Sequence, residues 1–110
     1  MGRLPRSLKR SRKQEKDTAK TLGGRVQPGS GNLRNPFLKE DTISDECLCQ
    51  CKTTEKASYS IKRKEFDETE ERALRQMKMP VWRITLQDET DLAVIRYQDL
   101  LQLMSDAGMR

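Results

Sequence analysis

The sequence contains no histidine, and this absence removes several kinds of chemistry at once. Ser-His-Asp and Cys-His catalysis, and zinc sites built on histidine, all need the missing imidazole. Any chemistry must therefore come from carboxylates, amides, lysines, hydroxyls or the three cysteines.

Long apolar runs are also missing. No stretch approaches the roughly 18 residues that a membrane-spanning helix needs. The charged N-terminus lacks the apolar segment of a secretory signal. With 110 residues, 34% of them hydrophobic, the chain has room for one small domain, which we expect to be soluble and intracellular.

The excess of positive charge lies at the N-terminus. Residues 1–20 hold eight basic and two acidic side chains. Their net charge of +6 is larger than the net charge of +5 of the whole sequence. We therefore expect a flexible basic arm over residues 1–12 and a nearly neutral domain over residues 13–110. Such an arm commonly binds an anionic polymer, although many basic termini only add solubility.

Periodicity and turn residues predict eight elements between the two ends. Helices are expected over residues 9–22, 64–78 and 97–107, strands over 25–27, 81–86 and 92–95, and a hairpin over 41–53 that turns near residues 45–46. This order predicts an α/β fold, in which a mixed sheet is flanked by helices.

The hairpin brings three polar residues together. With the turn at residues 45–46, Asp41 lies directly opposite Gln50, with Cβ atoms about 5 Å apart. Lys52 is the next residue on the same face, because side chains alternate along a strand. The plain alternative is an exposed hairpin face with polar pairs.

Oxygen ligands in this patch suit Mg²⁺, which often takes only one or two carboxylates. Asp41 offers an anionic oxygen, Gln50 an amide oxygen and Cys51 its main-chain carbonyl. Lys52 is then placed to orient water or to stabilise charge on a phosphorane. The three cysteines themselves share the other strand face, and we expect them to be buried as small apolar residues.

These residues also carry a resemblance. Asp41 followed by Gln50-Cys51-Lys52 resembles the PD-(D/E)XK nuclease motif. The wider set is similar to small archaeal and phage-type Holliday junction resolvases: Gly23-Gly24-Arg25, Pro28-Gly29-Ser30-Gly31, Lys39-Glu40-Asp41, Gln50-Cys51-Lys52-Thr53-Thr54 and Ser58-Tyr59-Ser60. The resemblance implies a restriction-endonuclease-like fold and a homodimer that cuts four-way DNA junctions.

The same resemblance implies roles for individual residues. Glu15 corresponds to a helix glutamate of the catalytic set, Asp41 to the metal-binding aspartate and Lys52 to the catalytic lysine. Ser30 would approach the scissile phosphate. Mg²⁺ is the implied cofactor, with Mn²⁺ as a substitute, and the expected location is the cytoplasm of a bacterial, archaeal or phage-infected cell.

Two positions depart from the family pattern. Gln50 replaces the usual Glu, and Glu40 stands where a Gly is common. Mrr-type restriction enzymes resemble this chain in using Gln-x-Lys. The alternatives are a catalytically impaired or engineered Glu→Gln variant that binds DNA junctions without cutting them, and a less selective DNA nuclease.

The residues expected to contact the DNA backbone are basic or hydroxyl side chains near the arm and the hairpin. They are Arg6, Lys9, Arg10, Arg12, Lys13, Ser30, Lys56, Ser58 and Lys62.

Overall fold

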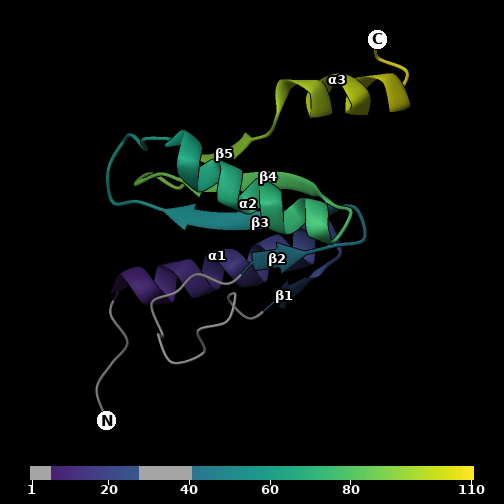
Figure 1. Cartoon of the computed structure of the whole chain (residues 1–110). Coiled ribbons are helices and arrows are strands. Elements are labelled where there is room, and N and C mark those ends of the chain that lie inside the picture. Colours follow the sequence, from purple (N-terminus) through teal and green to yellow (C-terminus); the bar gives the residue numbers. More distant parts are fainter. Residues whose placement is uncertain (1–5, 28–40) are drawn as a thin grey trace.

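Five strands form one mixed sheet in the computed structural model, which describes residues 6–27 and 41–110 (Figure 1). The helices are α1 (Arg6–Leu22), α2 (Arg63–Arg75) and α3 (Tyr97–Asp106). The strands are β1 (Arg25–Gln27), β2 (Asp41–Ile43), β3 (Cys47–Thr53), β4 (Met79–Thr85) and β5 (Asp91–Val94). The expected element order and the α/β class, with helices beside a mixed sheet, are confirmed.

The strands follow one another across the sheet in chain order, from β1 to β5. Every neighbouring pair is antiparallel except β3 and β4, which are parallel. A parallel pair needs a crossover connection, and α2 provides it. β3 is therefore the central strand, with α2 on one face and α1 on the other (Figure 1).

The hairpin has the register that its turn residues predict. Asp41 pairs with Gln50, Thr42 with Cys49 and Ile43 with Leu48. The turn closes where the Ser44 main-chain N–H donates to the carbonyl of Cys47, at 2.9 Å. Because side chains alternate, this register puts Asp41 and Gln50 on the same face of the sheet.

Some boundaries differ from the expected ones. α1 begins at Arg6, so residues 6–12 are helical and continue directly into the domain. α2 ends at Arg75, and Met77 reverses the chain with a φ of 57°. Pro80 lies inside β4 opposite Leu48, so β4 begins two residues before the expected start at residue 81.

The face of β3 that carries the cysteines lies under α1. Cys47, Cys49 and Cys51 are all buried free thiols, as expected for small apolar residues. The Cys51 thiol donates to the Thr18 hydroxyl of α1 at 3.3 Å. A hydrogen bond to Cys51, together with burial, raises the pKa of the Cys49 thiol.

The other face of β3 lies under α2. Leu48 packs with Ile43 and with Ala73 of α2. A second apolar cluster joins Phe66 of α2 to Trp82 of β4 and its neighbour Ile84. β3 is thus covered on both sides, as is typical of a strand with a parallel partner.

α1 holds the sheet through polar side chains. Gln14 is buried, and its side-chain amide donates to the Lys52 carbonyl at 2.7 Å and to the Thr85 hydroxyl at 2.8 Å. Arg83 of β4 bridges Asp17 of α1 and Asp91 of β5, both at 2.8 Å. The underside of α1 is therefore a hydrogen-bonded layer rather than an apolar stripe.

A glycine pair makes the corner between α1 and β1. Gly23 ends the helix in the left-handed region with a φ of 68°, and the Gly24 N–H donates to the Ala19 carbonyl at 2.8 Å. A Cβ on Gly24 would lie 1.9 Å from the Ile43 carbonyl oxygen of β2. Only glycine lets β1 approach its neighbour this closely.

α3 projects from the end of β5, away from the sheet (Figure 1). None of its residues is buried. It exposes the apolar side chains of Tyr97, Leu100 and Leu103.

Candidate functional site

The expected hairpin site lies on the α2 face of the sheet. Gln50 is buried there, at 6% exposure, and its backbone pairs with Asp41. Lys52 is two residues further along β3 and is half-buried. The structure therefore brings Asp41, Gln50 and Lys52 to one face at neighbouring strand positions.

Arg72 of α2 belongs to the same place, although no pattern in the sequence pointed to it. Its Nη2 donates to the Gln50 side-chain oxygen Oε1 at 2.6 Å. A hydrogen bond from a guanidinium is about twice as strong as one between neutral groups. The amide oxygen expected to bind a metal ion therefore accepts from a protein cation.

Lys52 lies over an aromatic platform. Its Nζ is 4.7 Å from the ring centroid of Trp82, a cation–π distance. Trp82 is fully buried, and its indole N–H donates to the Thr69 hydroxyl of α2 at 2.8 Å. Tyr59 contacts the same ring edge-on, with centroids 6.3 Å apart. Lys52 is thus held by a rigid support on the face that carries Gln50.

Glu15, the expected helix glutamate, is buried at 6% exposure on α1. It lies within electrostatic range of Cys51, whose side chain faces α1. α1 covers the face of β3 opposite to Gln50 and Lys52. The burial agrees with an inward-facing glutamate, while its catalytic role stays a prediction.

The residues expected to bind Mg²⁺ are not equally suited to do so. The side chain of Asp41 lies outside the part of the chain whose side chains the structure describes; among the side chains that it does describe, no group of three or more Cys, Asp or Glu could hold a metal ion. Gln50 fits poorly, because one lone pair of its oxygen already accepts a hydrogen bond from the positive guanidinium of Arg72. The Asp41 carboxylate and the Cys51 carbonyl remain as the predicted ligands.

Most residues expected to bind DNA on α1 share one solvent-facing side. Their spacing of three or four residues places them along one face of the helix. The exposed basic residues on α1 are Arg6, Lys9, Arg12, Lys13, Lys16 and Lys20, which we call the basic face. Lys16 and Lys20 were not among the expected contacts, although the helical period of the basic residues could have identified them.

Arg10 was expected to contact phosphate, but the structure turns it inward. Its side chain is 14% exposed, and its guanidinium donates to the carbonyls of Thr54 and Leu86. It also forms ion pairs with Glu55 and Glu89. Arg10 therefore ties α1 to the ends of β3 and β4 and is not part of the basic face.

The remaining expected contacts flank the C-terminal end of β3. Lys56, Ser58 and Lys62 are all exposed in the connection between β3 and α2. This connection begins just after Lys52 and passes beside Trp82 through Tyr59. Ser30 lies outside the described residues.

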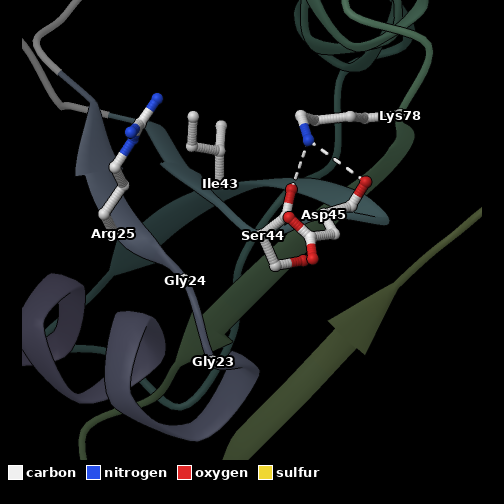
Figure 2. Close-up of a pocket in the computed structure, with 7 residues that line it drawn as sticks. All are labelled: Gly23, Gly24, Arg25, Ile43, Ser44, Asp45 and Lys78. Atoms are coloured by element: carbon white, nitrogen blue, oxygen red, sulfur yellow. Dashed lines mark hydrogen bonds between the residues drawn. The ribbon is translucent and has the colours of Figure 1, made fainter.

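A separate hollow of about 360 Å³ lies at the turn end of the hairpin (Figure 2). Lys78 reaches across it and donates to the main-chain carbonyls of Ser44 and Asp45, while Arg25 stands on the opposite side. The lining residues are Gly23, Gly24, Arg25, Ile43, Ser44, Asp45 and Lys78. Lys78 acts here as a brace for the turn.

The chain matches no protein-family model, no curated protein and no solved structure at a significant level. None of the helices in the described part of the chain is long and apolar enough to cross a membrane.

Proposed function

We propose that the protein is a structure-selective DNA endonuclease of the Holliday junction resolvase type. One observation carries the proposal: the register places Asp41 opposite Gln50, with Lys52 next on the same face. This is the juxtaposition that the resemblance to the PD-(D/E)XK motif requires of these three residues.

Asp41 would be the principal ligand for Mg²⁺, with the Cys51 carbonyl as a second donor. Bound there, Mg²⁺ would supply Lewis-acid polarisation of a phosphodiester oxygen. Lys52, held above Trp82, would place its charge beside the reacting phosphate and stabilise the negative charge that develops on it.

The DNA backbone would be bound by two groups of cations. The basic face runs along a helix of 17 residues, about 25 Å long. Lys56 and Lys62 lie in the connection that leaves the site. A second copy of the chain would complete the enzyme, because paired cuts in a four-way junction need two sites.

A cleavage assay tests the proposal. A labelled four-way junction is incubated with Mg²⁺ and the protein, with Asp41→Ala, Lys52→Ala and the exposed-turn control Asp45→Ala. We expect cleavage by the natural chain and by the control, and at least a hundredfold slower cleavage by the other two. If neither the natural chain nor Gln50→Glu cuts, while both are folded and dimeric, the catalytic proposal fails.

A second candidate is a DNA-junction-binding module without catalysis. The bond from Arg72 to Gln50 favours it, because that bond places a positive guanidinium against one expected metal ligand. A calorimetric Mg²⁺ titration separates the two, since absence of binding with and without DNA supports the module. Flap, duplex and single-stranded substrates, compared with the junction, separate a selective nuclease from a less selective one.

A further inference from the structure

The orientation of the Gln50 side chain follows from its contact with Arg72. A guanidinium has N–H donors and no acceptor, so only the oxygen of the amide can face it. The structure has Oε1 2.6 Å from Arg72 Nη2. The amide NH₂ group of Gln50 must therefore point away from the guanidinium, and in the described part of the chain it donates to no residue.

Buried neighbours fix the helix that carries Arg72. Thr69, one turn earlier, accepts the indole N–H of Trp82, and Ala73 packs against Leu48 of β3. Both contacts are independent of the guanidinium. Arg72 can therefore be changed to an unbranched apolar residue without removing the contacts that dock α2.

We propose that Arg72 makes Gln50 a hydrogen-bond donor to the phosphodiester rather than a metal ligand. The inference rests on the proposed function and assigns two roles within that site. Arg72 is a positioning residue that holds the amide oxygen, and Gln50 contacts the anionic substrate through its NH₂ group. Together with the ammonium of Lys52, this face presents donors suited to a phosphate oxygen.

The electrostatics agree with this assignment. A divalent ion bound at Gln50 Oε1 would lie beside the positive guanidinium, and like charges repel strongly at such distances. The phosphodiester carries the opposite charge and is attracted by both Arg72 and Lys52. The amide of Gln50 therefore favours an anion over a metal ion.

A double-mutant cycle tests the inference on the full chain. Mg²⁺ affinity is measured by calorimetry, and junction affinity is measured in EDTA, for the natural chain, Gln50→Ala, Arg72→Met and the double variant. Arg75→Met is the matched control, since Arg75 lies on the same helix and is exposed. Thermal unfolding verifies that each variant is folded.

We expect Gln50→Ala to leave Mg²⁺ affinity unchanged in the natural background and to lower metal-free junction affinity about tenfold, the effect of one hydrogen bond to a charged group. In the Arg72→Met background, where the amide oxygen is released, Gln50→Ala should weaken Mg²⁺ binding. A merely structural role for Arg72 would not produce this dependence on background. Arg72→Lys should restore most of the natural behaviour, and Arg75→Met should match the natural chain.

Two results overturn the inference. One is a tenfold loss of Mg²⁺ affinity on Gln50→Ala in the natural background, which would make Gln50 a ligand. The other is a metal-free junction affinity that Gln50→Ala leaves unchanged, and this result decides the matter where Mg²⁺ binding is too weak to measure. Neither readout needs cleavage, so an inactive protein with the expected affinities contradicts only the proposed function.

Discussion

At the scale of single residues, the candidate site depends on side chains that fix one another. Arg72 holds Gln50, and Trp82 supports Lys52 while donating to Thr69. These contacts link α2 to β3 and β4 at the positions where the chemistry is proposed. Changes in buried supporting residues such as Thr69 should therefore lower the stability of the fold without removing a proposed reacting group.

Thr69→Val tests this support. The substitution keeps the shape of the side chain but removes the acceptor of the buried Trp82 indole N–H. An unsatisfied buried donor costs about 1–3 kcal/mol, so the free energy of unfolding in urea should fall by that amount. Thr21→Val, an exposed change on α1, is the control and should cost about 0.5 kcal/mol or less.

Asp91 should make part of the stability depend on pH. Two hydrogen bonds from Arg83, with a further one from Thr85, lower the pKa of the Asp91 carboxyl. A lowered pKa stabilises the fold above the unfolded value, near 3.9, and the contribution disappears as the pH falls through the folded value.

The measurement is urea unfolding of the natural chain and Asp91→Asn between pH 6 and pH 2. The natural chain should be the more stable at pH 6, and the difference should shrink toward pH 2. A difference that stays constant over this range would show that the Asp91 charge contributes nothing.

At the scale of elements, the corner between α1 and β1 is the most restricted position. Gly24→Ala would drive a Cβ into the Ile43 carbonyl, 1.9 Å away, and backbone must shift to admit it. We expect a loss of about 2–3 kcal/mol in the free energy of unfolding.

Gly23→Ala provides the matched control for this prediction. Its left-handed φ of 68° is unfavourable for alanine, but nothing lies within 4 Å of the new Cβ. The cost should be about 1 kcal/mol. Equal losses for the two variants would contradict the steric explanation.

The strand pairing within the hairpin could be predicted from the sequence, but the contacts that other elements make with the hairpin could not. Alternation and turn residues indicated the pairing of Asp41 with Gln50, because both signals are local. The contact of Arg72 with Gln50 spans 22 residues and depends on the crossover through α2. Basic residues near the C-terminal end of a helix also interact favourably with the helix dipole, so the position of Arg72 in the sequence does not single it out.

The contacts of α1 were missed for the same reason, because they join residues that are distant in the sequence. A flexible arm was expected over residues 1–12 because positive charge is concentrated there, yet α1 begins at Arg6 and Ser11 shares a hydrogen bond with Thr53 of the sheet. Further along α1, Gln14 and Thr18 also bond to polar groups of the sheet. Hydrogen bonds replace the missing apolar stripe, and no periodicity of apolar residues can reveal them. The inward turn of Arg10 was hidden for the same reason.

At the scale of the whole molecule, the basic face and the candidate site belong to opposite sides of one sheet. If α1 binds DNA as proposed, that DNA would have to reach the α2 face around the sheet or through a second subunit. We expect the basic face to contribute affinity for DNA, and the residues of β3 to be responsible for catalysis.

Replacing Lys9, Lys13 and Lys16 together by Ala tests this division. Junction affinity should fall, and its log–log dependence on salt should decrease by about 0.9 for each phosphate that is no longer neutralised. The control is Arg10→Ala, which should lower thermal stability and leave the salt slope unchanged. A slope unaffected by the triple change would remove the basic face from DNA binding.

The proposed dimer predicts a role for α3. A helix of ten residues is marginal in water without packing, and α3 exposes Tyr97, Leu100 and Leu103. Leu103→Glu should shift the protein toward the monomer in sedimentation, whereas the neighbouring exposed change Gln102→Glu should not. A natural chain that is monomeric at every concentration would contradict the dimer.

Trp82 is the only tryptophan in the sequence, and it lies directly beneath the ammonium of Lys52. Intrinsic fluorescence excited at the indole band therefore originates almost wholly from the candidate site. Any ligand that draws Lys52 away from the ring changes the field around the indole and hence its emission. The protein thus carries a built-in optical probe, and occupancy of its site can be followed in solution without a label.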